Sequence, residues 1–497
     1  MNFDIQTFLN SSFLTLLPLF LGGGIFFNLF GENQIIIRRA AKWFMGLFTA
    51  YSLLFTLNFN SNTQFDFNSS LNFFNQTTLN FNLDLLSSIT ISIFCFITFI
   101  CLIVAKSLIT KQHKTFYSFA LLFLSSFICT LTTNNVSLFL YALMFETFCI
   151  YMLIANFSNK KSDKSLVFLN FATILFLSAV FGALDVIFKA NLTSINVSQI
   201  LENIKNLPQI IQFLTSCVFF LFCTINLGVF PLHKPLVNTI KNLNAAGIFL
   251  PIGQALLAFC LFIKFNFLAL FDIFWIAHSL ICTIFITSTI ILGLLALKQI
   301  NLKEGLGYFY LSQNTIPLIS ICALSQIGIN GGIFSIFSNA IIFLGLILYC
   351  AFAILKLKTE KLPLMGALLT KAPMLAIFGL FFTFAGVGIP LTCGFISKIL
   401  CALGGFSSEA ISQNVIWICI VILISSYILA GLFLIKIFSQ IFLGTSNIQE
   451  KITDIPKHQF LALGLICLIC TLFGIMPQII LEYISNYGEL ITSTFVF

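Results

Sequence analysis

Fourteen apolar stretches, bounded by clusters of Asn, Lys, Pro and Gly, follow one another along almost the whole chain. A helix needs about 20 apolar residues to cross a bilayer. Only 8% of the 497 residues are charged, against about a quarter in soluble domains. We therefore expect an all-α polytopic membrane protein, with spans near 8–30, 43–60, 85–105, 116–132, 137–157, 166–188, 209–231, 245–263, 274–297, 306–326, 331–355, 373–403, 414–442 and 459–479.

Lysine and arginine collect on alternate connections between these stretches, which supports the count of spans. Basic residues accumulate on one side of a membrane protein. The other connections and both termini hold only Lys189, Lys205 and Lys264, so both termini should lie opposite the basic face. Without interleaved Arg and aromatic residues, the basic loops indicate topology and no nucleic-acid partner. Nineteen of the 24 basic residues lie in 31–42, 106–115, 158–165, 232–244, 298–305, 356–372 and 443–458.

The chain carries no recognisable motif for a nucleotide, a metal or a hydrolytic reaction, so we predict no catalytic residue and no metal site. Most of the 15 cysteines lie inside apolar stretches. The pair Cys467 and Cys470 has no acidic, basic or His neighbours, and we interpret these thiols as small apolar side chains. His278 lies near the start of a span, where a structural role is favoured.

Four ionisable residues remain inside the spans: Glu146, Asp185, Lys398 and Lys436. A charge at mid-bilayer costs at least about 2.5–3.5 kcal/mol. Glu146 lies roughly 15 Å from either end of its span and cannot reach the surface. It is predicted to carry a proton or an ion, the alternative being a hydrogen-bonded structural acid. Asp185 and Lys436 lie near their span ends, where a long side chain reaches water, and structural roles are favoured.

Two spans are interrupted by glycine and proline. Segment 373–403 would measure about 46 Å as one helix, well over the hydrocarbon thickness of about 30 Å, and it contains Gly388 and Pro390 ahead of Lys398. Segment 209–240 contains Gly228 and Pro231 in the same arrangement. Paired breaks of this kind are typical of transporters built from repeats. The breaks fall in spans seven and twelve, and the odd spacing of five predicts two inverted five-helix units.

The spans divide the chain into four predicted parts. Residues 1–110 hold helices 1–3 with the polar loop 61–84, which alternates aromatic and polar residues and is expected to form a hairpin. The two five-helix units are 116–263 and 274–443. Helix 14 and a tail occupy 444–497. Uncharged polar residues inside the spans either extend a proton path or bond helix to helix: Asn226, His233, Gln254, Ser312, Gln313 and Asn314.

Four strings resemble elements of one family: LFLYALMFETFCIYMLIA, NLGVFPLHKPL, ALKQINLKEGLGYFYLSQN and AGVGIPLTCGFISKIL. They are similar to the acidic span, the broken spans and the tenth span of the antiporter-like membrane subunits of respiratory complex I and of cation/proton antiporters. The resemblance covers about residues 85–445. Within the family, Lys398 in G-F-x-x-K favours mitochondrial subunit 2, because subunit 4 has Glu there and subunit 5 is longer.

The resemblance implies a non-catalytic subunit of proton-translocating NADH:ubiquinone reductase. By position, Glu146 corresponds to the acid of the first half-channel and Lys398 to the terminal proton carrier. Its partners would be membrane lipid and the other complex I subunits, chiefly the neighbouring antiporter-like ones. NADH, FMN, iron–sulfur clusters and ubiquinone would be bound elsewhere in the complex. Because 63 Phe and few Arg suggest A/T-rich coding, we expect an organelle-encoded protein of the mitochondrial inner membrane.

Three positions depart from the family pattern. Asn226 aligns with the lysine of span seven, Gln254 falls at or beside the lysine of span eight, and Gln313 replaces the histidine of the tenth element. Amide side chains carry no proton near neutral pH, although they can order water. Four alternatives therefore stay open: a proton-translocating subunit, a structural subunit of the same fold with impaired transport, a subunit 4 or 5 paralogue, and a free-standing cation/proton antiporter.

Overall fold

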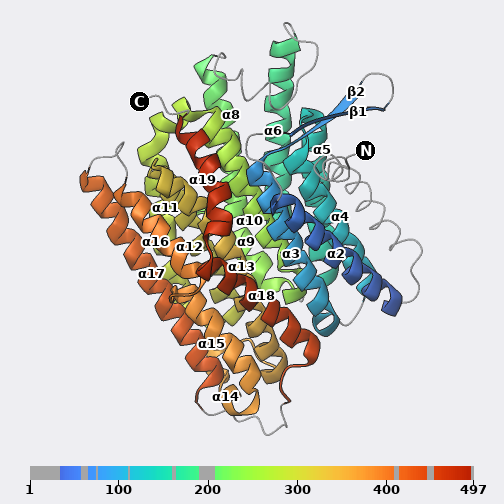
Figure 1. Cartoon of the computed structure of the whole chain (residues 1–497), viewed down its shortest axis with the longest axis vertical. Helices are drawn as coiled ribbons and strands as arrows, with labels where there is room; N and C mark the ends of the chain where they lie inside the picture. The colour runs from blue at the N-terminus through green and yellow to red at the C-terminus, as the bar shows by residue number, and fades with distance from the viewer. Residues whose placement is uncertain are drawn as a thin grey trace, which may run out of the picture. The chain divides into compact units, whose positions relative to one another are not determined.

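In the residues that it describes, the computed structural model is helical apart from one two-stranded hairpin (Figure 1), which confirms the predicted all-α fold class. It describes residues 34–57, 65–73, 77–109, 112–158, 164–189, 208–407, 413–444 and 453–493. The first predicted span, 8–30, lies outside these ranges. The α-helices are α2 (Gln34–Leu57), α3 (Leu85–Leu108), α4 (His113–Thr132), α5 (Val136–Phe157), α6 (Ser165–Lys189), α8 (Gln209–Leu227), α9 (Lys234–Asn242), α10 (Phe249–Leu261), α11 (Phe271–Lys298), α12 (Leu302–Cys322), α13 (Gln326–Leu357), α14 (Leu368–Lys371), α15 (Pro373–Val387), α16 (Cys393–Phe406), α17 (Gln413–Phe442), α18 (Lys457–Ile475) and α19 (Gln478–Ser493).

Each predicted span from the second to the fourteenth corresponds to one helix or to a pair of shorter helices. Within the described ranges, nine helices are long and apolar enough to cross a membrane. The more polar α12 is almost entirely buried. A helix with this many polar residues is stable inside a membrane protein when other helices surround it.

Several helical segments were not predicted, of which two are longer than a few residues. A π-helix at Phe262–Ala269 extends the helix that begins at Phe249. In the predicted tail, α19 contacts α13 and buries Ile480 and Ile484. Polar residues such as Glu482 and Glu489 interrupt its apolar pattern, so α19 is too amphipathic to be recognised as a span.

The described residues of the polar loop, 65–73 and 77–84, include the two strands of the predicted hairpin (Figure 1). Strands β1 (Phe65–Phe73) and β2 (Thr77–Leu83) are antiparallel, and Phe65 pairs with Leu83. Phe81 of β2 also pairs with Thr133. This bridge places the hairpin beside the connection between α4 and α5.

The helices form two compact units. One comprises the described parts of 1–226 and 256–276, and the other those of 227–255 and 277–497. These units group helices by their contacts, whereas the predicted repeats 116–263 and 274–443 follow chain order. The repeats and their inversion therefore remain predictions.

In the second unit, α13 packs against α12, α15, α16, α18 and α19. Glycine allows α16 to approach α13 closely, because a Cβ at Gly404 would lie only 2.3 Å from the Cα of Gly328. Ser325 Oγ donates a hydrogen bond to the carbonyl oxygen of Gly404 at 2.7 Å. Small residues at helix crossings are typical of membrane bundles.

Three predicted basic connections of this second unit lie together. Lys241 Nζ is 2.5 Å from Glu304 Oε2, and Lys303 Nζ is 2.9 Å from Glu360 Oε1. The amide of Leu302 also donates to the carbonyl of Glu360 at 2.9 Å. Connections 232–244, 298–305 and 356–372 therefore share one face, as their charge predicted.

Candidate functional site

The second predicted break separates α15 from α16 as expected. The chain leaves α15 at Gly388, which has a φ of +89° and therefore a left-handed backbone that glycine adopts without strain. Pro390 follows in the connection, and α16 begins at Cys393. A Cβ at Gly394 would lie 2.0 Å from the carbonyl oxygen of Ala385, so this glycine lets the two half-helices approach closely.

Lys398 bonds to the carbonyl groups at the end of α15. Its Nζ donates to the oxygens of Gly386 and Val387, at 2.6 and 2.7 Å. It also lies 4.9 Å from the ring centroid of Tyr427, within range of a cation–π interaction. The last carbonyls of a helix lack helical partners and carry partial negative charge. The break therefore supplies the groups that stabilise a charged lysine inside the protein.

A small cavity adjoins Lys398. Gln313, Asn339 and Tyr310 line it together with Gly386 and Gly394, and its volume of about 10 Å³ is close to the room that one water needs. The side-chain amide of Asn339 donates to the backbone oxygen of Gln313 at 2.8 Å. Gln313 and Lys398, both predicted positions of the proton path, therefore line the same cavity. Asn339 was not predicted, although a lone Asn in an apolar stretch was a signal.

The first predicted break separates α8 from α9. Gly228 has a φ of +72°, and a Cβ there would lie 2.6 Å from Leu311 side-chain atoms. The peptide bond before Pro231 is cis. His233 is 3% exposed, and the centroid of its ring is 5.5 Å from that of Phe230 and 5.7 Å from that of Tyr308. Among the described residues, its Nδ1 has no hydrogen-bond partner.

Asn226 and Gln254, predicted at the central positions, are both buried. Asn170 Nδ2 donates to Asn226 Oδ1 at 2.9 Å, and Asn226 Nδ2 donates to the carbonyl of Phe222 at 2.9 Å. Asn226 therefore joins α8 to α6. Asn170 was not identified from the sequence as a partner of Asn226. A single Asn in an apolar stretch does not show which neighbouring helix its side chain contacts.

Glu146 lies in the middle of α5 and points away from the exposed side of that helix. Its side chain is 3% exposed, whereas Tyr141 and Phe148 are 66% and 45% exposed. Its Oε2 has no hydrogen-bond partner among the residues that the structure describes. A buried carboxyl oxygen without a partner favours a proton or ion role over a hydrogen-bonded structural acid.

The two ionisable residues near span ends have simpler surroundings. Lys436 Nζ donates to the carbonyl of Leu297 at 2.7 Å, which satisfies the end of α11 and agrees with the predicted structural role. Asp185 lies on α6, and its side chain is outside the described part. The structural role predicted for Asp185 therefore stays a prediction.

Comparisons with known proteins agree with the resemblance in the sequence. Subunit M of NADH-quinone oxidoreductase from Rickettsia prowazekii (strain Madrid E) is 27% identical over 397 residues, which are 78% of each chain. Chain 4 of NADH-ubiquinone oxidoreductase from Chondrus crispus is 25% identical over 98% of this chain and 99% of that protein. These relatives are of the subunit M and chain 4 type, so the prediction of subunit 2 is not supported.

Two solved structures share the fold. A chain of respiratory complex I from Thermus thermophilus with bound NADH matches with a TM-score of 0.82 at 18% identity, over 97% of this chain and 99% of that chain. A chain of the Mrp complex from Dietzia sp. DQ12-45-1b also gives 0.82, at 16% identity and 98% coverage of both. The model of the transmembrane family of NADH:quinone oxidoreductase and Mrp antiporter subunits matches residues 133–429. The chain therefore belongs to this family of multi-pass membrane proteins.

Proposed function

We propose that this chain is a proton-translocating membrane subunit of a respiratory NADH:quinone oxidoreductase. The observation that carries the proposal is the position of Lys398, which donates to two carbonyls of a broken helix beside a small polar cavity. A buried lysine can bind and release a proton, and helix-end carbonyls stabilise its charged form. Reactions of NADH and quinone belong to other subunits, and this chain contributes transport.

Proton transfer at Lys398 would use the groups that line the cavity. Gln313 and Asn339 offer amide groups that can orient a water next to Nζ. Loss of a proton from Lys398 would weaken its bonds to Gly386 and Val387, because a neutral amine donates less strongly than an ammonium. Glu146, on α5 in the other unit, is the proposed acid of the first half-channel. Asn226, Gln254 and His233 are proposed as polar positions of the path.

Within the family, we propose the subunit M or chain 4 type. Relatives of this type match 78–98% of the chain, whereas the preference for subunit 2 depended on Lys398 alone. Lys398 would then be a departure from the Glu that chain 4 carries at this position. A location in the mitochondrial inner membrane is supported by the A/T-rich composition and by the Chondrus crispus relative.

A second candidate is a structural subunit of the same fold with impaired transport. Asn226 favours it, because an amide stands where the family has a lysine and both ends of that amide are hydrogen-bonded. In either case, we propose the other subunits of the complex and membrane lipid as partners. NADH, FMN, iron–sulfur clusters and ubiquinone would be held by those other subunits.

Co-purification tests the proposed assembly. The chain would be tagged in its natural host, extracted in mild detergent and purified, and the eluate would be assayed for NADH:quinone reductase activity. We expect this activity to be enriched with the tag. A tagged chain recovered intact with no such activity would overturn the proposal and would favour a free-standing antiporter.

A further inference from the structure

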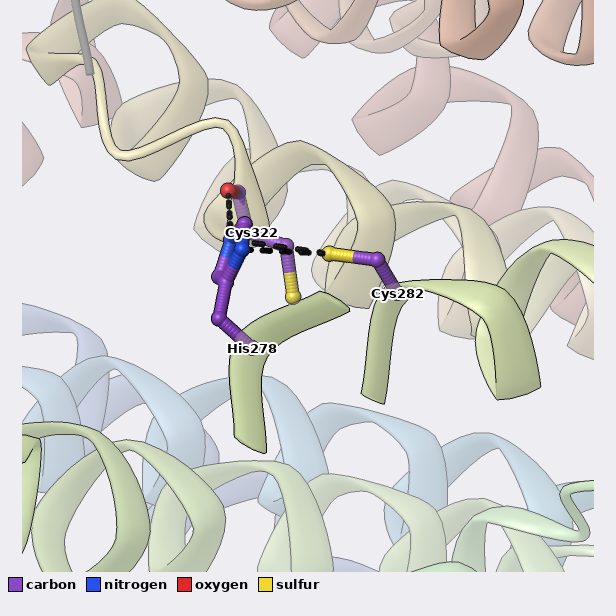
Figure 2. A group of neighbouring side chains, drawn as sticks. All are labelled: His278, Cys282 and Cys322. Carbon is purple, nitrogen blue, oxygen red and sulfur yellow. Dashed lines mark hydrogen bonds between the residues drawn. The ribbon is translucent and has the colours of Figure 1, made fainter. Parts of the chain in front are cut away.

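His278, Cys282 and Cys322 form a cluster that lies apart from the proposed path in sequence and uses none of its residues. Figure 2 shows the three side chains converging from α11 and α12. His278 and Cys282 are four residues apart and therefore project from one face of α11. Cys322 is the last residue of α12, the helix that precedes the connection to α13. This cluster was not predicted, because Cys322 lies 44 residues after His278 in the chain.

The ligand atoms are spaced as donors around one ion would be. One nitrogen of His278 and the sulfurs of Cys282 and Cys322 all lie within 4.8 Å of one another. Cys282 Sγ is 4.0 Å from His278 Nδ1. Donors bound to zinc at about 2.0 Å (N) and 2.3 Å (S) stand roughly 3.5–4 Å apart. Small side-chain rotations would bring the three atoms to bonding distance.

The surroundings of His278 also resemble those of a metal-binding histidine. Its Nε2 is 2.8 Å from the backbone oxygen of Cys322, so Nε2 carries the proton and donates (Figure 2). Metal-binding histidines almost always donate one ring N–H to a carbonyl, a carboxylate or water. That bond fixes the orientation of the ring, whose Nε2 and Nδ1 lie 3.5 and 4.0 Å from Cys282 Sγ. In this tautomer, Nδ1 is the nitrogen that would bind the ion.

We propose that His278, Cys282 and Cys322 bind a thiophilic metal ion, Zn²⁺. Two thiolates and one neutral imidazole are soft donors, a combination that zinc accepts. Two thiolates balance the charge of a dication, which suits the interior, since Cys322 is 1% exposed. Both thiols lose a proton on binding, and the protons leave to solvent. The bound ion would tie α11 to α12, which carries Gln313.

Zinc uptake by the purified, tagged complex tests the proposal. The complex would be stripped with a chelator, titrated with Zn²⁺ and analysed for zinc per chain, in the wild type and in the variants Cys282→Ser and His278→Gln. Cys217→Ser, another half-buried thiol, is the matched control. We expect one zinc fewer per chain, or at least about ten-fold weaker binding, in the two cluster variants only. X-ray absorption should show two sulfur ligands on the zinc ion that the wild type binds and the variants lack.

A second measurement on the wild type guards against variants that fail to fold. Cys282 and Cys322 should react with N-ethylmaleimide in stripped complex and be protected by Zn²⁺, as identified by mass spectrometry. Equal zinc content in wild type and both variants would overturn the proposal. So would a Cys282–Cys322 disulfide in the isolated protein, or protection by cuprous ion without protection by zinc.

Discussion

Two lysines inside the spans bond to backbone carbonyls, yet their surroundings differ. Lys436 satisfies the end of a continuous helix through Leu297. Lys398 bonds to Gly386 and Val387, whose carbonyls are released where the helix breaks, and it faces a cavity with Gln313. A lysine at the end of an unbroken helix, such as Lys436, caps that helix and has a structural role. A charge beside a polar cavity in the middle of a span, as at Lys398, is typical of transport paths. Of these two lysines, we therefore propose a transport role only for Lys398.

At the residue scale, Glu146→Gln tests the acid of the first half-channel. Glutamine keeps the size of the side chain and removes its exchangeable proton. We expect the complex to assemble at normal levels and to pump protons much more slowly, as measured by acidification of the outer medium during NADH oxidation. Exposed Glu482→Gln is the control and should leave pumping unchanged. Normal pumping in Glu146→Gln would exclude a proton role for this residue.

Burial of Glu146 was predictable because its distance from both span ends follows from counting residues. The hydrogen-bond partners of Lys398 were not predictable. They are backbone carbonyls that lack helical partners because α15 ends in a turn, and the geometry of this turn depends on Gly388. The hydrogen bond from Asn170 to Asn226 was also not predictable from the sequence. Hydropathy records how deep a residue lies in a span, and it holds no information about the helix that this residue faces.

At the scale of elements, both broken helices use the same device. Gly228 and Gly388 each end a half-helix in the left-handed region, with φ of +72° and +89°, and a proline follows within three residues. Glycine and proline in the sequence were sufficient to predict these breaks. The π-helix after α10 and the amphipathic α19 were missed, because neither leaves a distinctive apolar pattern.

Gly388→Ala tests the second break. A methyl group in the left-handed region costs roughly 1–2 kcal/mol, and here its Cβ would also lie 2.9 Å from Lys398 Cδ. Gly444→Ala is the matched control, since Gly444 has a φ of +85° and nothing within 4 Å. We expect similar losses of thermal stability in both variants, and a loss of proton pumping in Gly388→Ala only. Equal pumping in the two variants would contradict the role of the break.

Gly404→Ala tests the crossing of α13 and α16. Its Cβ would lie 2.3 Å from the Cα of Gly328, and backbone cannot yield as a flexible side chain does. Overpacking of this kind costs about 1–3 kcal/mol. We expect a lower midpoint of thermal unfolding in detergent, whereas Gly464→Ala, with open space around its Cβ, should unfold like the wild type. An unchanged midpoint in Gly404→Ala would mean that the helices do not pack this closely.

At the scale of the whole molecule, contacts within each unit agree with the predicted sides of the membrane. On the side opposite the basic face, Gln326 Nε2 donates to Glu489 Oε1 at 3.2 Å. In the other unit, Lys264 Nζ lies 2.7 Å from Asp84 Oδ1, and both residues were predicted on that same side. These contacts agree with the sides that the basic residues predict for these connections. Lys398 alone was a poor basis for predicting subunit 2, because the similarity to relatives of the subunit M and chain 4 type extends over most of the chain.

Labelling of introduced cysteines tests this topology. Thr359→Cys lies in a basic connection and Ser407→Cys in one opposite. By the positive-inside rule, a membrane-impermeant maleimide added to the matrix or cytoplasmic side should label position 359, and from the other side it should label position 407. Labelling of the wild type, which has 15 cysteines, provides the background. Both positions labelled from one side would contradict the assigned number of spans between them.

The central claim is that Lys398 carries protons, and the ratio of protons pumped to NADH oxidised tests it most directly. Lys398→Met would be compared with Lys436→Met, which removes another lysine that bonds to helix-end carbonyls. The number of protons pumped per NADH oxidised would be measured for each variant in sealed vesicles and normalised to the amount of assembled complex. We predict a lower ratio in Lys398→Met and an unchanged ratio in Lys436→Met. An unchanged ratio in fully assembled Lys398→Met complex would contradict the account.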